Sequence, residues 1–276
     1  MTKPIDMMRL PAIDVHGHCG VFDGYPEATA HLLNAPAEEV SARAWACAIT
    51  WTLVSELGAF DVAEDRPSDV DAANRRAQEA AERLDNLLFY AVVNPRREGW
   101  QAKTERLLAD PRCVGVKLHP CWHFWTPEEC GNEVFSFAHE RRLIVLTHTG
   151  NEGNEPERFI PYADKYPHVK LILAHIGHDD VHDRRDAQIN AVRKSTQGNV
   201  WADTSSAKSI TSRLIEYAVE RIGTDRILFG TDTPLYFAAM QKARIAYAQI
   251  SEVAKRKILY ENAAALLPDL PQSRSG

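Results

Sequence analysis

Eight short apolar runs, each followed by a longer amphipathic and charged segment, constrain the fold of this chain more than any other feature. Such alternation is typical of repeated βα units around a parallel sheet. The runs at residues 143–146 and 171–174 are continuously hydrophobic, as expected for strands covered on both faces. The predicted strands are Ala12–His16, Ala46–Thr52, Leu87–Asn94, Cys113–His119, Leu143–His148, Val169–His175, Val200–Thr204 and Arg226–Asp232.

The segments between these runs predict the helices that cover the sheet. Ser68, with Asp71 three residues later, resembles a capping box at the start of one helix. Barrels of this class have about 250 residues, and this chain has 276. We therefore expect a single-domain (β/α)8 TIM barrel over residues 1–267 and a loose tail at 268–276. The expected helices are Ser68–Leu84, Gly99–Ala109, Pro127–Arg142, Asp183–Thr196, Ile210–Ile222 and Glu252–Leu267.

The composition limits the partners and the compartment. A net charge of -6 without a basic cluster argues against binding to nucleic acid or to an anionic membrane, so we expect a small-molecule substrate. The five cysteines form no Cys-x-x-Cys pair, and Met1–Leu10 has no apolar signal core. These features predict a cytoplasmic protein. The sequence leaves open whether the chain is a monomer or a homo-oligomer.

A His-x-His pair ends the first predicted strand, in the motif Ile-Asp-Val-His-Gly-His. Residues two apart in a strand face the same side, so His16 and His18 present both imidazoles on one face, with Cα atoms roughly 7 Å apart. That arrangement can chelate one ion. The alternative is that both are polar residues at a strand end without a ligand.

The positions of further ionisable residues favour a metal site. Active sites of these barrels are built at the carboxyl ends of the strands. Unrelated core histidines would not gather there, so we predict one divalent cation at this end of the barrel. The residues that stand at the ends of predicted strands, shortly before a glycine or proline, are Lys117, His119, His148, His175 and Asp232.

With these motifs in this order, the sequence resembles the amidohydrolase superfamily, and within it the amidohydrolase-related branch that includes the aminocarboxymuconate semialdehyde decarboxylase type. The resemblance extends over nearly the whole chain. One departure is Gly-His-Asp-Asp at 177–180, where many relatives carry two glycines, and it concerns the rim of the pocket. The matching motifs are Ile13–His18, Gly115–Pro120, Thr147–Gly150, Ala174–Gly177, Leu228–Pro234 and Lys257–Ala264.

The resemblance implies that His16, His18, His148 and Asp232 bind the metal, and that His175 faces the substrate as an acid or base. It also implies that Asp232 carries a proton to the leaving group. Mixed imidazole and carboxylate ligands suit zinc with one position left for water, whose pKa zinc lowers to about 7. Zn²⁺ is therefore the expected ion, with Mn²⁺ and other first-row ions as alternatives.

Lys117 lies on the same face of its strand as His119 and has two alternative functional roles. Its ammonium would bind a substrate carboxylate as a point charge, with His119 as a hydrogen-bond partner of the same group. Carboxylated on its amine, it would instead bridge a second metal, as in the two-metal members of the superfamily. A structural alternative is a lysine paired with a neighbouring acid. We expect the ammonium role, because the branch that the chain resembles generally has a one-metal site.

Aromatic residues near the predicted strand ends indicate a planar or ring-shaped substrate. We expect Trp51 and Trp122 to bind it, although aromatic residues at such positions also serve as packing anchors. The connections Cys19–Ala44 and Ser55–Pro67 are long for βα loops, which predicts lids or pocket walls.

Other polar residues near the motifs are expected to have supporting roles. Asp14 and Asp203 are candidates to orient a ligand histidine. His178 and His182 lie in a charged loop and are expected to be solvated, and Cys19 is expected to be buried rather than a ligand.

The leading functional hypothesis is a hydrolase that cleaves a C–N or C–O bond of an amide, lactone or ester with metal-activated water. The alternative is a non-oxidative decarboxylase of an aromatic or unsaturated acid, since the branch that the chain resembles contains both. The chain is compact, which favours hydrolysis, because the decarboxylases tend to have longer inserted lids. A third hypothesis, an inactive binding protein on the same barrel, is disfavoured because every predicted ligand and catalytic residue is present.

Overall fold

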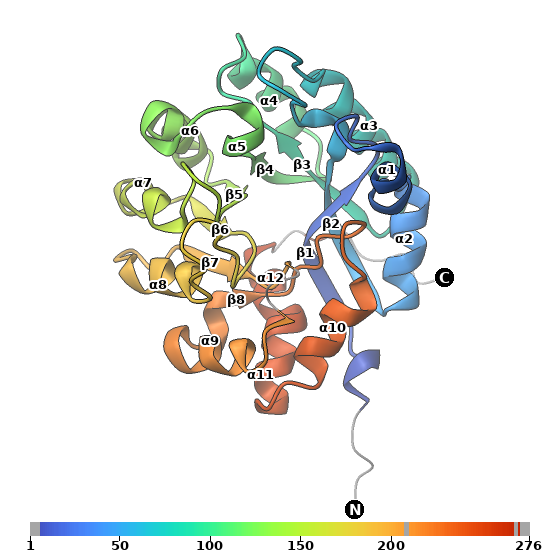
Figure 1. Cartoon of the computed structure of the whole chain (residues 1–276), viewed down its shortest axis with the longest axis vertical. Coiled ribbons are helices and arrows are strands. Elements are labelled where there is room, and N and C mark those ends of the chain that lie inside the picture. The colour runs from blue at the N-terminus through green and yellow to red at the C-terminus, as the bar shows by residue number, and fades with distance from the viewer. Residues whose placement is uncertain (1–5, 207–209, 268–269, 271–276) are drawn as a thin grey trace, which may run out of the picture.

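The computed structural model describes residues 6–206, 210–267 and 270. Eight parallel strands form one sheet in the order β1 to β8, and helices surround it (Figure 1). This confirms the predicted (β/α)8 barrel. The predicted tail at 268–276 lies outside the described residues, except for Leu270. The strands are β1 (Ala12–Cys19), β2 (Ile49–Glu56), β3 (Leu87–Val92), β4 (Cys113–Leu118), β5 (Ile144–Thr147), β6 (Lys170–Leu173), β7 (Val200–Asp203) and β8 (Ile227–Leu228).

The helices form the outer layer of the barrel. The closing helix contains a π-helical turn at Lys257–Glu261 between α11 and α12. The α-helices are α1 (Glu27–Leu33), α2 (Ala37–Ala46), α3 (Val70–Arg83), α4 (Trp100–Leu108), α5 (Pro120–His123), α6 (Pro127–Glu140), α7 (Ile160–Lys165), α8 (Ala187–Lys194), α9 (Leu214–Ile222), α10 (Ala238–Ala246), α11 (Glu252–Arg256) and α12 (Asn262–Leu266).

Main-chain hydrogen bonds between the first and last strand regions close the barrel. The amide of Val15 donates to the carbonyl of Phe229 at 2.9 Å, and the amide of Asp232 donates to the carbonyl of His16 at 2.7 Å. A bridge between Gly17 and Thr233 continues the contact. The carboxyl ends of all eight strands therefore meet around one opening.

Two apolar clusters pack against the sheet, one inside the barrel and one between the strands and the helices. Residues two apart along the strands, such as Ile13 and Val15 of β1, fill the barrel interior, and the other strand faces pack against the helices. Leu266 and Leu267 belong to the interior cluster. Trp51 belongs to the same cluster and is 3% exposed.

The largest departures from the predicted elements lie between β1 and β2. The second strand begins at Ile49 rather than Ala46, because residues 44–46 complete the last turn of α2. The apolar run is continuous from Ala44 to Ile49 and contains no turn residue to mark the boundary. The connection Cys19–Ala44, which was expected to be a long loop, contains α1 and most of α2.

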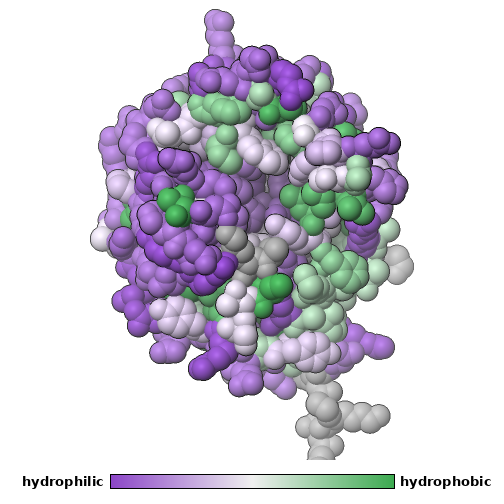
Figure 2. Space-filling view, viewed as in Figure 1, coloured by the Kyte–Doolittle hydropathy of each residue, from purple (hydrophilic) through white to green (hydrophobic). Residues whose placement is uncertain are grey.

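The surface seen in Figure 2 is mostly hydrophilic and is hollowed near the centre of the ring of helices. Among the residues that the structure describes, none of the helices has the length and apolar character needed to cross a bilayer.

Lys242 of α10 is fully buried and joins segments that lie far apart in the sequence. Its ammonium donates to the carbonyls of Leu10 and Cys47 at 2.6 Å and to that of Ala48 at 3.1 Å. A buried ammonium is tolerated where its donors are satisfied, and here three carbonyls satisfy them. Lys242 therefore ties the segment before β1 and the turn before β2 to the last part of the chain.

We predict that Lys242→Met lowers the free energy of unfolding by about 2 to 4 kcal/mol, because it leaves buried carbonyl groups without a donor. Urea unfolding followed by circular dichroism measures this change. Lys194→Met is the control: its side chain is 61% exposed, and the expected change is within about 0.5 kcal/mol. Equal stability of the two variants would contradict the structural role of Lys242.

Candidate metal centre and active site

His16, His18 and Asp232 form a compact group at the carboxyl ends of β1 and β8. Oδ1 of Asp232 lies 3.4 Å from Nε2 of His16 and 3.1 Å from Nε2 of His18. All three residues are buried. Two ligands about 2.1 Å from one ion at a tetrahedral angle are about 3.4 Å apart, so these spacings fit three donors that share one cation.

The other ring nitrogen of each histidine is already held by the protein. Nδ1 of His16 donates to Oδ2 of Asp203 at 2.9 Å, and Nδ1 of His18 donates to the carbonyl of Ser55 at 3.2 Å. Each imidazole therefore carries its proton on Nδ1 and directs the lone pair of Nε2 toward Asp232. Such outer hydrogen bonds are typical of metal-binding histidines, because they fix the ring and the tautomer.

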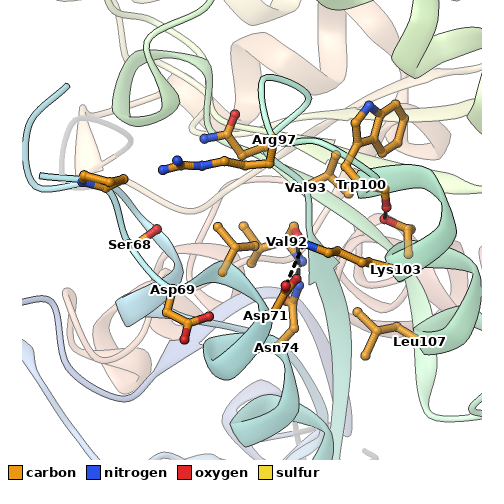
Figure 3. Close-up of a pocket in the computed structure, with 14 residues that line it drawn as sticks. Ser68, Asp69, Asp71, Asn74, Val92, Val93, Arg97, Trp100, Lys103 and Leu107 are labelled. Atoms are coloured by element: carbon orange, nitrogen blue, oxygen red, sulfur yellow. Dashed lines mark hydrogen bonds and ion pairs between the residues drawn. The ribbon is translucent and has the colours of Figure 1, made fainter. Parts of the chain in front are cut away.

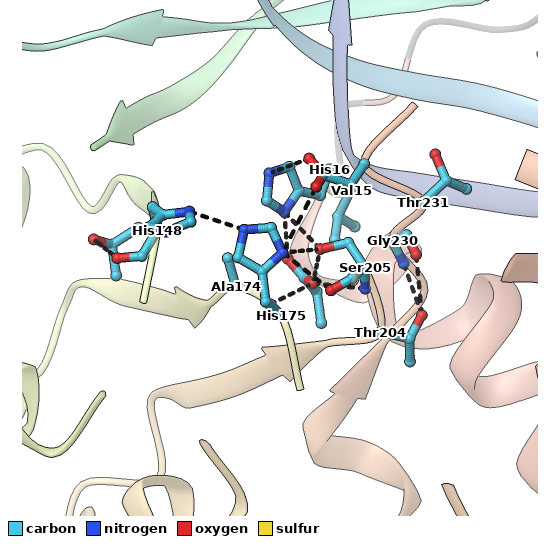
Figure 4. A network of polar contacts seen from close by, with 12 residues as sticks. Val15, His16, His148, Ala174, His175, Thr204, Ser205, Gly230 and Thr231 are labelled. Atoms are coloured by element: carbon cyan, nitrogen blue, oxygen red, sulfur yellow. Dashed lines mark hydrogen bonds and ion pairs between the residues drawn. The ribbon is translucent and has the colours of Figure 1, made fainter. Parts of the chain in front are cut away.

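Asp203 and Ser205 connect His16 to His175. Figure 4 shows Ser205 between the two histidines. The hydroxyl of Ser205 donates to Oδ1 of Asp203 at 2.5 Å, and it lies 2.9 Å from Nδ1 of His16 and 3.0 Å from Nδ1 of His175. Asp203 also accepts from the amide of His175 at 3.0 Å. The candidate ligand and the candidate acid or base are thus oriented by the same two residues.

Asp14 supports the site differently from our expectation. Its carboxylate accepts from the amides of His16 and Thr231, at 3.1 and 2.9 Å, and from the Thr231 hydroxyl at 2.5 Å. No contact of Asp14 with an imidazole is present among the described residues. It therefore holds the main chain of β1 against the β8 region, and burial raises its pKa to about 7.

His148 lies next to the site but outside the three-residue group. Its Nδ1 is 2.9 Å from Nε2 of His175, and its Nε2 is 2.6 Å from the side-chain oxygen of Asn151. Figure 4 shows His148 on the far side of His175 from His16. The predicted set of four ligands thus divides in this structure into a group of three and a separate histidine.

His175 and Asp232 both adopt left-handed backbone conformations, with φ of +70° and +58°. Few residues other than glycine adopt such angles, and those that do are common at functional sites. Burial lowers the pKa of His175 to about 3. Burial would raise the pKa of Asp232, but the neighbouring imidazoles of His175 and His16 hold it well below its usual range. The resting site contains a neutral imidazole and a carboxylate.

Lys117 is fully buried beside the candidate metal ligands. Its Nζ donates to Nε2 of His16 at 2.7 Å, the atom that faces the cation position. Burial lowers the pKa of Lys117 to about 8. His119 is two residues further along the chain, and its ring stacks on His148 with centroids 4.1 Å apart.

The cavity at the strand ends has a volume of about 150 Å³. Trp122 lines it as predicted, and Tyr25, Leu57 and Phe60 come from the two long connections that were expected to form pocket walls. Leu235 and Tyr236 complete the aromatic and apolar wall and were missed, because no motif marks the segment after β8.

Two predictions about pocket residues are wrong. Trp51 does not bind at the pocket: β2 continues five residues beyond it to Glu56, so Trp51 packs in the barrel interior with Leu266 and Leu267. His178 was expected to be solvated, but it lines the cavity. His182 and Cys19 agree with expectation, since His182 is 59% exposed and Cys19 is buried.

A separate cavity of about 340 Å³ lies between α3 and α4 (Figure 3). Several of its polar side chains have partners within the protein: Lys103 pairs with Asp71 at 2.8 Å, and Asn74 bonds the main chain of Val92. It contains none of the strand-end histidines. The chemistry of the site therefore belongs to the smaller cavity.

Comparison with known proteins shows the family of this chain. Residues 13–268 match the amidohydrolase family. The chain belongs to this family. A segment of 116 residues is 34% identical to gamma-resorcylate decarboxylase from Polaromonas sp. strain JS666, and it spans 37% of this chain and 35% of that relative.

Solved structures share the fold over most of their length. A dihydroxybenzoic acid decarboxylase from Polaromonas sp. JS666, with bound manganese and the inhibitor 2-nitroresorcinol, matches with a TM-score of 0.70 and 16% identity, covering 94% of this chain and 97% of that one. A probable 2-pyrone-4,6-dicarboxylic acid hydrolase from Acinetobacter baumannii matches with a TM-score of 0.65 and 16% identity, covering 94% and 100%. The family and the fold are thus shown, and this fold is shared by a protein named as a decarboxylase and by one named as a probable hydrolase.

We predict that Asp203→Asn weakens metal binding by about 10- to 100-fold, because the neutral amide no longer holds the Nδ1 proton of His16 against a negative charge. Titration of the chelator-stripped protein with a divalent metal measures this change. Asp225→Asn, at an exposed carboxylate that pairs with Lys257, should bind as the unmodified protein does. Unchanged affinity in Asp203→Asn would refute the orienting role.

Proposed function

We propose that this protein is a metal-dependent, non-oxidative decarboxylase of a small aromatic or unsaturated carboxylic acid. The observation that carries the proposal is the narrow, aromatic-walled cavity directly beside His16, His18 and Asp232. Loss of CO2 turns a charged carboxylate into a neutral product, which the aromatic and apolar part of the cavity wall favours. The local similarity to gamma-resorcylate decarboxylase supports the same choice over hydrolysis.

The cation is expected to be held by His16, His18 and Asp232. A bound divalent cation would supply positive charge against the substrate oxygens. Imidazole and carboxylate ligands suit both Zn²⁺, the ion expected from the donor types, and Mn²⁺, the ion bound by the dihydroxybenzoic acid decarboxylase. The resemblance adds His148 as the fourth ligand, and in this structure its Nδ1 lies 2.9 Å from Nε2 of His175.

The substrate carboxylate is proposed to lie near Lys117 and His119. The Lys117 ammonium donates to His16 in this structure, and it is the buried cation closest to the candidate ligands among the described residues. A planar ring is proposed to lie against Phe60 and the tyrosines Tyr25 and Tyr236, which line the cavity together with His119. Both faces of Trp122 are already covered by Phe22 and His119, and Lys117 is not among the lining residues.

Decarboxylation replaces the bond between carbon and carboxylate with a C–H bond, so one proton must reach that carbon as CO2 leaves. Asp232 and His175 are the groups placed to carry it, since both line the cavity. His175 lies 3.9 Å from Asp232 through its Nδ1. We propose that this proton comes from solvent water and reaches the substrate carbon through His175 and Asp232, which in the resting site are a neutral imidazole and a carboxylate.

Hydrolysis of a C–N or C–O bond is the second candidate. It is favoured by His175, whose Nδ1 proton is directed at the Ser205 carbonyl at 3.0 Å. Its Nε2 lies 2.9 Å from Nδ1 of His148, so a water molecule would have to replace that contact before His175 could take its proton.

We predict that the metal-loaded protein releases CO2 from ortho-hydroxylated benzoates, with gamma-resorcylate as the first probe. A coupled CO2 assay and chromatography of the phenol product measure this reaction, and lactones and amides of similar size test hydrolysis. Asp232→Ala should lose both the metal and the activity, since it removes one of three close donors. Hydrolysis without CO2 release from any acid would overturn the proposal, and full metal content in Asp232→Ala would overturn the ligand assignment.

We predict that His175→Asn lowers kcat by about 10² to 10⁴ while metal content stays unchanged, because His175 acts in proton transfer rather than as a ligand. Steady-state kinetics and elemental analysis of the same preparation measure the two quantities. Asn86→Ala, a change at a buried residue before β3 that hydrogen-bonds with Ser41 and does not line the cavity, controls for general loss of packing. Metal loss in His175→Asn equal to that in Asp232→Ala would place His175 among the ligands.

A further inference from the structure

One aromatic side chain separates the small cavity at the strand ends from a larger groove beside it. The strand-end cavity has a volume of about 150 Å³, and the groove has a volume of about 830 Å³. Among the residues that the structure describes, Phe60 is the one that lines both. We propose that Phe60 sets the size limit of the substrate by closing the strand-end cavity toward the groove. This inference rests on the proposed function, because it concerns the acid that is decarboxylated.

The strand-end cavity has room for one aromatic ring. An apolar cavity of about 150 Å³ holds a benzene molecule, and the volume here is the same. A second ring fused to the first must therefore extend beyond the cavity. On the side of Phe60 the space beyond is the groove, whose wall includes the apolar residues Val21, Ala35, Pro36 and Val62. Loss of the Phe60 ring would join the two spaces and give a second ring an apolar surface to pack against.

Ring contacts hold Phe60 in its place between the two spaces. Phe60 is 2% exposed, and its ring centroid lies 4.8 Å from that of His119, 5.6 Å from that of Trp122 and 5.8 Å from that of His18. The interplanar angles are 56°, 65° and 78°, in the range of the tilted and edge-to-face arrangements that aromatic pairs prefer. Rings from β1, from the residue after β4 and from α5 thus support the Phe60 ring.

The main chain on both sides of Phe60 is anchored as well. The carbonyl of Ala59 accepts from the hydroxyl of Ser68 at 2.7 Å and from Nε2 of His123 at 3.0 Å. The carboxylate of Asp61 accepts from the amide of Ser68 at 2.8 Å. Ala59, Asp61 and His123 are buried, so breaking these hydrogen bonds is costly. The Phe60 ring is therefore a fixed wall of the strand-end cavity.

The experiment compares one-ring and two-ring acids on the metal-loaded full chain. Salicylate is the one-ring probe. The two-ring probes are two ortho-hydroxynaphthoates that add a fused ring to salicylate in different directions. Isothermal titration calorimetry gives the Kd of each acid, and CO2 release is measured separately on the same preparations. Binding and turnover are thus tested independently.

Phe60→Ala removes the wall, and Phe60→Leu retains more of the packing in case the alanine variant does not fold. Two matched controls on the same connection each enlarge one space without joining the two. Leu57→Ala enlarges the strand-end cavity, because Leu57 lines that cavity but not the groove. Val62→Ala enlarges the groove, because Val62 lines the groove but not the cavity. Circular dichroism checks that each variant is folded.

We expect Phe60→Ala to lower the ratio of the Kd of at least one hydroxynaphthoate to that of salicylate by about 10- to 100-fold, because the second ring gains space. Phe60→Leu should shift the ratio less and in the same direction, and both controls should keep the ratio of the unmodified protein. Such a shift without CO2 release from any acid would refute decarboxylation and support the role of Phe60. The role of Phe60 is wrong if the unmodified protein binds none of these acids, if it binds both hydroxynaphthoates as tightly as salicylate, if the folded Phe60 variants keep its ratio, or if Leu57→Ala shifts the ratio equally.

Discussion

The closure of the sheet between β1 and β8 is the constraint on which the rest of the molecule depends. Parallel pairing brings the carboxyl ends of all strands to one opening, but only closure brings His16 next to Asp232. The amide of Asp232 donates to the carbonyl of His16, so the main-chain bond that closes the barrel also joins two candidate ligands. Architecture and site are thus specified by the same residues.

The ionisable groups of this site are buried, so each of them needs a hydrogen-bonding or charged partner. Lys117, Asp203 and Asp232 are ionisable groups held away from water, and each is costly to bury unless it has a partner. Each has one: Lys117 donates to His16, Asp203 accepts from His16 and Ser205, and Asp232 lies against both histidines of the His-x-His pair. Removing any one of these groups leaves its partners unsatisfied, so the network is organised as a unit.

The sequence predicted the barrel and the strand-end clustering because each ionisable residue there is followed closely by a turn residue, which locates the end of its strand. The prediction failed where such a residue is absent. Trp51 was placed at a strand end because the apolar run from Ala44 onward has no internal boundary, and the strand in fact begins later and continues to Glu56. Side-chain direction was also beyond the sequence, since strand position alone cannot show that His148 turns toward His175 and Asn151.

Because residues from the first and last strand regions close the barrel, the candidate metal site forms only when folding is nearly complete. His16 and Asp232 belong to the first and last strand regions, so their contact is among the most non-local in the molecule, and contacts of this kind form late and slowly. A partly folded chain would hold the ligands apart and bind a cation weakly. A cation that binds only the closed barrel would stabilise it by mass action, so the metal supply of the cell would influence how much of the protein persists in its folded form.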